Sequence, residues 1–145
     1  MDSIRIDTGL KRIAINEDPN RIIEFNPKDL LFAEKFYAMV KEIKTMLKEI
    51  ENKSVEFDIR SKDVDFDDPK FTDVIDEALI FHKQSCEKMF EEIDKLFGKG
   101  VSEMVFQGVY ALEVIAQFLD GIAPFITEER SAKVEKYMKR IPARK

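Results

Sequence analysis

The residues best suited to chemistry are few in this sequence. His82 and Cys86 are its single histidine and single cysteine, and they stand four residues apart. On a helix this spacing puts both side chains on one face, where they could reach one metal ion. Zinc sites need three or four ligands, and the sequence offers no further histidine or cysteine. We therefore expect neither a metal site nor a cofactor, and we expect His82 to be a partly buried residue on a helix face.

Three aspartates form a second pattern. Asp63, Asp65 and Asp67 have the spacing of the first, third and fifth ligands of an EF-hand calcium loop. That loop needs glycine at its sixth position and glutamate at its twelfth, where this sequence has Asp68 and Val74. The segment is therefore expected to be an acidic, solvated loop.

The known catalytic motifs are also incomplete in this sequence. A nucleophile paired with histidine would depend on His82, which stands on a predicted helical stripe with no glycine-rich elbow beside it. Gly98 and Gly100 flank Lys99 without the GxxxxGK(S/T) frame of a phosphate-binding loop. The many carboxylates belong to charged faces, where solvation explains them. We predict a protein that is not an enzyme.

Composition favours one folded helical domain. The chain has 145 residues, of which 44% are hydrophobic and 37% are charged. This mixture suits amphipathic helices, which bury one face and solvate the other. Twelve phenylalanines supply enough apolar surface to oppose disorder. We expect a single domain over residues 1–145.

Net charge and the character of the chain ends indicate which cellular compartment and which classes of partner to expect. A net charge of −5 disfavours a nucleic-acid partner. Residues 56–77 are acidic, whereas the C-terminus is basic, and we expect residues 141–145 to form a basic tail. The sequence has no signal-peptide pattern, no apolar run of membrane-spanning length and one cysteine, which fits a reducing compartment. We therefore expect a cytoplasmic protein with no membrane partner.

Alternating residues predict short strands near the N-terminus. Ile4 and Ile6 alternate with polar residues, and a second alternation surrounds Ile13 and Ile15. A turn is predicted around Pro19, between this segment and the next strand. Residues 1–26 are therefore expected to form a small antiparallel β-ribbon that packs on helices.

The remaining chain predicts a helical array over residues 27–140. Asn26 is the expected N-cap of a first helix of roughly 25 residues, followed by a partly extended acidic segment at 53–70, the best candidate for a mobile region. Further helices are predicted over 68–97, 102–119 and 127–140, and Gly121 and Pro124 interrupt the chain between the last two. The fold class is mainly α, with about four helices and a small N-terminal antiparallel β-ribbon.

The apolar stripes of the first two helices are long. Phenylalanine and methionine recur along them at helical spacing, which predicts a core and also suits an adaptable binding surface. Two such stripes exceed what one short partner helix can cover. We therefore predict an exposed apolar groove or a self-association surface.

Several segments together resemble a known family. These are residues 4–9 (IRIDTG), 23–29 leading to 32–36 (IEFNPKD and FAEKF), 96–101 (LFGKGV) and 132–137 (AKVEKY). They are similar to the small tail assembly chaperones of long-tailed phages and prophages of Gram-positive bacteria. That family has an apolar stretch with asparagine and glycine after its Phe-Gly segment, which residues 106–110 follow only in part.

The resemblance implies a specific partner. Such chaperones are small and mostly helical, bind the tape-measure protein in the cytoplasm of the bacterial host, and keep it soluble before the tail tube forms. It also allows tail-tube subunits as further partners, a frameshift-extended form of the protein, and absence from the finished virion. Two alternatives remain open: a permanent structural protein of the tail or connector, and a nonviral regulatory or antitoxin-like protein that uses the basic tail.

The candidate partner-binding residues come from two helices, and core burial is the competing interpretation for each. They are Phe32, Phe36, Met39, Val40, Phe106 and Tyr110.

Overall fold

The fold is mainly α with a small β-hairpin, as the sequence predicts. We describe a computed structural model, which defines the backbone of residues 1–140 and the side chains of residues 1–128. The predicted basic tail at 141–145 lies outside the described residues. In chain order the elements are β1 (Lys11–Ile15), β2 (Asp18–Phe25), α1 (Leu30–Ser61), α2 (Pro69–Phe97), α3 (Val101–Phe106) and α4 (Leu112–Arg140).

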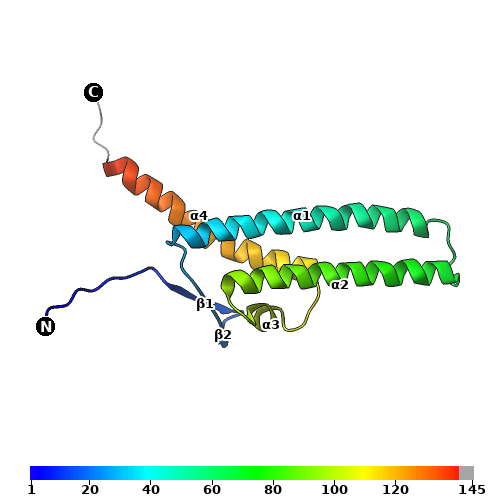
Figure 1. The fold of residues 1–145 in the computed structure, drawn as a ribbon, viewed down its shortest axis with the longest axis horizontal. Helices are drawn as coiled ribbons and strands as arrows, with labels where there is room; N and C mark the ends of the chain where they lie inside the picture. Colours follow the sequence, from blue (N-terminus) through cyan, green and yellow to red (C-terminus); the bar gives the residue numbers. More distant parts are fainter. Residues whose placement is uncertain (141–145) are drawn as a thin grey trace, which may run out of the picture.

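Helices α1 and α2 form a long antiparallel pair that dominates the shape (Figure 1). The carboxylate of Asp29 accepts a hydrogen bond from the Leu31 backbone at the start of α1, and Asp68 does the same for Lys70 at the start of α2. Such caps satisfy backbone donors that the first helical turn leaves free. Gly98 ends α2, as predicted, with a positive φ of 124°.

Helix α1 starts and ends later than predicted. Asn26 is not its N-cap: the Asn26 side chain accepts from the Lys28 backbone and so forms a turn before the helix. The prediction that part of residues 53–70 is extended is wrong, because α1 continues to Ser61. Phe57 explains this, since it is buried seven residues, or about two helical turns, after Ile50 and so continues the same stripe. The loop between the two helices is residues 62–68.

The predicted helix at 102–119 is divided in the structure. Gln107 and Gly108 both have positive φ and end α3 after Phe106. Conversely, α4 runs from Leu112 to Arg140 as one helix, so the predicted interruption at Pro124 is wrong. A proline inside a helix costs about 3 kcal/mol. Burial of Ile122 and Ile126 on either side of Pro124 offsets that cost.

The β-hairpin is shorter than predicted and turns at another place. Residues 1–10 form no strand, so the prediction for Ile4 and Ile6 is wrong. The turn lies at Asn16 and Glu17, both with positive φ, as two-residue hairpin turns require. Pro19 is instead the second residue of β2, in a part of that strand where the register shifts.

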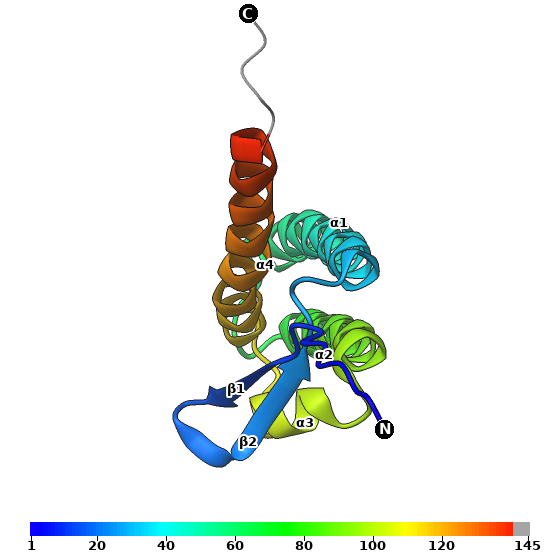
Figure 2. The ribbon, with the colours of Figure 1, turned by 90° about the vertical axis from the view of Figure 1, so that its left-hand side faces the viewer.

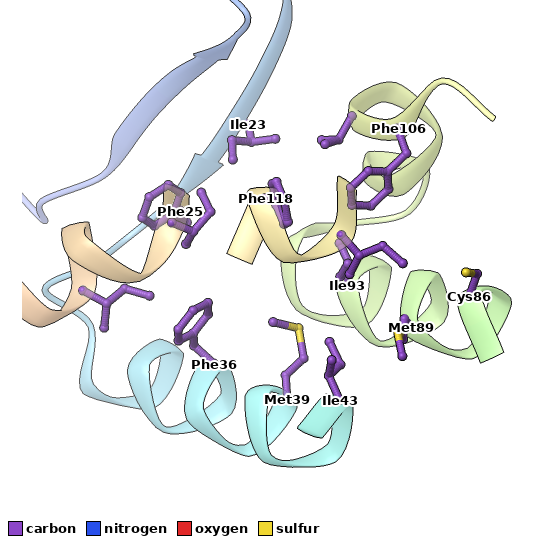
Figure 3. Close-up of a cluster of buried hydrophobic side chains, with 14 of the residues drawn as sticks. Ile23, Phe25, Phe36, Met39, Ile43, Cys86, Met89, Ile93, Phe106 and Phe118 are labelled. Atoms are coloured by element: carbon purple, nitrogen blue, oxygen red, sulfur yellow. The ribbon is translucent and has the colours of Figure 1, made fainter. Parts of the chain in front are cut away.

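One apolar core joins the hairpin to all four described helices. Figure 3 shows its centre, where β2 contributes Ile23 and Phe25, and Phe118 of α4 lies beside the ring of Phe106. The most deeply buried large side chains come from β2, α1, α2 and α4. They are Phe36, Ile23, Ile43, Met89, Ile93, Ile115 and Ile126. The hairpin and the four helices thus share one core cluster.

Polar links fix the short helix α3 in place. The Arg21 guanidinium donates from Nε to the Met104 carbonyl at 3.0 Å and from a terminal nitrogen to the Val105 carbonyl at 2.7 Å. On the other side, the Asp94 carboxylate accepts from the backbone and the hydroxyl of Ser102, at 2.7 and 3.0 Å. Because α3 is too short to be stable alone, these links are what anchor it to β2 and α2. None of the described helices is long and apolar enough to cross a membrane.

Candidate functional site

Helix α4 covers only half of one face of the α1–α2 pair. Figure 1 shows α4 starting near the middle of that pair and running away from its free end, while Figure 2 shows it lying beside both helices. At the covered end, Leu112, Ile115 and Leu119 face side chains of both helices around a small apolar hollow of about 160 Å³. The seam between α1 and α2 therefore already accepts one helix along part of its length.

Beyond the start of α4 the same seam is open. A hollow of about 150 Å³ lies in it between α1 and α2, and a larger one of about 590 Å³ lies beside it, between α2 and the residues that lead from α3 into α4. Leu112 lines both the covered hollow and the larger open one, and His82 lines both open hollows, so each hollow adjoins the next. We call the two open hollows together the hairpin groove, after the helical hairpin that α1 and α2 form, not after the β-hairpin. Its apolar and aromatic lining is Phe57, Val74, Ile75, Ala78, Leu79, His82, Cys86, Tyr110, Ala111 and Leu112.

The hairpin groove has a buried floor and exposed apolar walls. Phe57, Val74 and Cys86 are buried, whereas Leu79 is 62% and Tyr110 is 48% exposed. Exposure of large apolar surface to water is unfavourable, so a partner that covers these side chains lowers the free energy of the system. The surface is therefore suited to binding another apolar surface.

Charged groups stand at the edges of the hairpin groove. Lys83 lies over the Tyr110 ring at 5.8 Å, Asp58 lines the smaller hollow and Glu113 the larger one. Near the free end, Arg60 of α1 forms a 2.7 Å ion pair with Glu77 of α2. This hydrogen bond lowers the pKa of Glu77 and raises that of Arg60. The pair is exposed, so it aligns the helices more than it stabilises them.

His82 brings an unsatisfied polar atom to the hairpin groove. Its Nε2 is buried and has no hydrogen-bond partner among the described residues. A buried polar atom without a partner is costly, and such atoms are rare in folded proteins. His82 lines both open hollows, so this unsatisfied atom lies in their shared wall, below the surface that solvent reaches.

The acidic loop and the His82–Cys86 pair do not form a metal centre in the described part of the chain. No group of three or more histidine, cysteine, aspartate or glutamate side chains there is arranged to hold an ion. Asp68 is used as the N-cap of α2, and Asp63 adopts a positive φ at the end of α1. These aspartates therefore have local structural roles.

Comparison with known proteins places the chain in a family. The family of unknown function DUF6673 matches residues 20–145. The chain belongs to this family. The match includes the whole hairpin groove and leaves out β1 and the residues before it. No curated protein and no solved structure matches the chain.

The structure separates the six residues that the sequence suggests as partner contacts. Phe36, Met39 and Phe106 are core residues, as the competing interpretation has it. Phe32 and Val40 are partly buried and pack against that core. Tyr110 alone lines the hairpin groove.

The sequence does not indicate three wall residues of the hairpin groove as partner contacts, although His82 is considered there as a metal ligand. Ile75, Leu79 and His82 belong to the α2 stripe, which looks like an ordinary core stripe. The available signal was the length of that stripe, since a stripe longer than its covering helix leaves part of itself exposed.

Burial predicts a slow thiol at the floor of the hairpin groove. Desolvation raises the pKa of Cys86, and nearby Glu87 raises it further, so the reactive thiolate is scarce at neutral pH. We expect Cys86 to react with a thiol-specific reagent far more slowly in the native protein than after unfolding in guanidinium, with the native rate rising towards alkaline pH. Time-resolved alkylation followed by mass spectrometry measures both rates. Equal native and unfolded rates would show that Cys86 is not buried.

Proposed function

We propose that this protein is a non-catalytic helix-binding chaperone of phage tail assembly, and that it holds an amphipathic segment of the tape-measure protein in the hairpin groove. The observation that carries the proposal is the seam between α1 and α2. It holds α4 at one end and stays open at the other, where the exposed Ile75 lines it and the exposed Leu79 stands beside it on α2. A seam that packs one helix has the shape to pack a second one in line with it.

The spacing of the walls favours a helical client. Ile75, Leu79 and His82 stand at intervals of four and three along α2, and therefore line one side of the hairpin groove as a continuous row. Phe57 of α1 lines the smaller hollow together with Ile75 and His82. Helix-in-groove recognition uses this arrangement, with apolar anchors of the client one helical turn apart.

The resemblance to tail assembly chaperones supplies the identity of the client. A tape-measure protein is a very long helical chain with apolar stripes, which need cover until the tail tube encloses them. Transient cover calls for an adaptable apolar surface of moderate size rather than a permanent interface. The hairpin groove and its charged edges supply such a surface, and binding would take place in the cytoplasm of the bacterial host.

The test compares two neighbouring aliphatic residues of α2, of which only Leu79 lines the hairpin groove. Leu79→Asp puts a charge in the wall of the hairpin groove, whereas Ile80→Asp puts the same charge on an equally exposed residue (57%) outside it. We expect Leu79→Asp to weaken binding of a tape-measure helix by about tenfold or more, equivalent to roughly 1.4 kcal/mol, because a buried unpaired carboxylate is costly. Ile80→Asp should bind like the unchanged protein.

Two measurements decide the outcome. Fluorescence anisotropy with labelled peptides from the tape-measure protein of the same genome gives the affinities, and co-expression gives the soluble fraction of a longer tape-measure fragment. Equal effects of the two variants would reject the hairpin groove as the site. Binding no tighter than that of an unrelated amphipathic helix would reject the tape-measure protein as the client.

A further inference from the structure

The first ten residues form an apolar arm with nothing to cover it. Figure 1 shows them leaving the body of the molecule as an extended segment. Ile4 is 85% and Ile6 is 72% exposed, and Leu10 is also exposed. Ile4 and Ile6 alternate with Ser3, Arg5 and Asp7, a pattern that gives an extended chain one apolar and one polar side.

The base of the arm is held in a fixed direction. The Asn26 side-chain amide donates to the Thr8 carbonyl at 2.6 Å, and the Gly9 backbone donates to the Asp7 carboxylate at 2.9 Å. Gly9 has a φ of 90°, a backbone conformation that is strained for any residue with a Cβ atom, so this position favours glycine. The arm therefore leaves the body at a defined turn and cannot simply reverse onto the strand that follows it.

Strand β1 offers a matching place for an extended chain. It pairs with β2 along one edge, and its other edge carries no strand among residues 1–140. Between β1 and α4 lies a hollow of about 240 Å³, separate from the hairpin groove. Its lining is mainly apolar: Ile13, Ile15, Asn16, Val105, Phe106, Val114, Gln117, Phe118, Gly121, Ile122 and Phe125.

We propose that residues 3–7 of one copy of this chain add as a strand to the free edge of β1 in a second copy, with Ile4 and Ile6 entering the hollow beneath α4. Strand addition satisfies the unpaired backbone groups of β1 and buries the apolar side of the arm in one step. The added segment and β1 are both five residues long, so the two match in length.

A second copy is the occupant because every chain carries both complementary parts. The arm begins directly beside its own β1, since Leu10 precedes Lys11, and the bond from Asn26 to Thr8 directs it away from that edge. The same bond leaves the edge accessible to the arm of another molecule. Reciprocal exchange gives a closed dimer, and one-directional exchange gives an open chain of copies.

Full-length variants test the arm and the hollow separately. Ile4→Asp/Ile6→Asp removes the apolar side of the arm, and Ser3→Asp is its control on the polar side. Gly121→Leu fills the hollow; no atom lies within 4 Å of a Cβ atom at Gly121, and leucine favours a helix more than glycine does, so the fold is retained. Circular dichroism checks that every variant remains folded.

Sedimentation velocity across a concentration series gives the result. We expect the unchanged protein and Ser3→Asp to self-associate, and Ile4→Asp/Ile6→Asp and Gly121→Leu each to be monomeric. An equimolar mixture of these two monomeric variants should form a one-to-one complex, because one retains the hollow and the other retains the arm. A monomeric unchanged protein at high concentration, or an assembly that persists in Ile4→Asp/Ile6→Asp, would overturn the proposal.

Discussion

Replacing Phe36 by alanine is expected to lower the free energy of unfolding by about 3–5 kcal/mol, the usual cost of deleting a fully buried phenylalanine side chain. Phe36 is 1% exposed and lies in the common core of α1, α2, α4 and the β-hairpin. Domains of this size are typically stable by only about 5–15 kcal/mol. The variant should therefore unfold at clearly lower guanidinium concentration, with an unchanged denaturant slope.

The chain contains a matched control for this substitution. Phe66 is 80% exposed in the loop between α1 and α2, where its ring contacts only that of Phe71 among the described aromatic pairs. Phe66→Ala should cost less than about 1 kcal/mol. Equal unfolding midpoints for the two variants would contradict the core position of Phe36 and would favour its predicted role as a partner contact.

Replacing Arg21 by alanine is expected to cost about 2–3 kcal/mol. Its guanidinium donates to two carbonyls at the end of α3, so the substitution leaves the Met104 and Val105 oxygens without their cationic donor. It also removes a positive charge from a helix C-terminus, where such charge is favourable. The loss of stability should be larger in α3 than in the fold as a whole. Amide hydrogen-exchange rates should therefore increase more in α3 than in α2 when Arg21 is replaced by alanine.

Two arginine variants control for charge and geometry. Arg12 pairs with Glu24 on the exposed side of the same hairpin, so Arg12→Ala should cost less than about 1 kcal/mol. Arg21→Lys keeps the charge but cannot donate in a fork, and should fall between the unchanged protein and Arg21→Ala. Guanidinium unfolding midpoints measure all three. An Arg21→Ala midpoint equal to that of Arg12→Ala would show that the contact with α3 contributes nothing.

Local signals in the sequence were enough to predict α2. Asp68, Pro69 and Gly98 mark its ends by capping chemistry that does not depend on the rest of the fold. The stripe of α1 was equally clear as far as Ile50. Its continuation to Phe57 was not, because Val55, Phe57 and Ile59 alternate with polar residues as in a strand, and only the burial of Phe57 reveals the helix.

The errors near the C-terminus have tertiary causes. Gln107 is an ordinary helix former, yet here it adopts a left-handed conformation that lets the chain turn from α3 into α4. Pro124 is a strong breaker by local rules, and core packing around it overrides those rules. Neither outcome can be read from a window of neighbouring residues.

The candidate site shows a similar limit. Periodicity identifies which side chains share a face of a helix, but not which part of that face another helix covers. Phe36 and Leu79 both belong to apolar stripes, yet Phe36 lies in the core shared with α2, α4 and the β-hairpin, whereas Leu79 is an exposed groove wall. The sequence therefore predicted that an apolar surface exists, and the structure was needed to place it.

The short link between α1 and α2 also has a consequence for the order of folding. The two helices are joined by residues 62–68 only, so their pairing closes a short loop and has a small entropic barrier. The contact of Arg21 with Met104 joins residues 83 positions apart in the sequence and therefore closes a much longer loop. During synthesis on the ribosome, the helical pair can therefore form first, while the β-hairpin waits without its docking partner until α3 has been made.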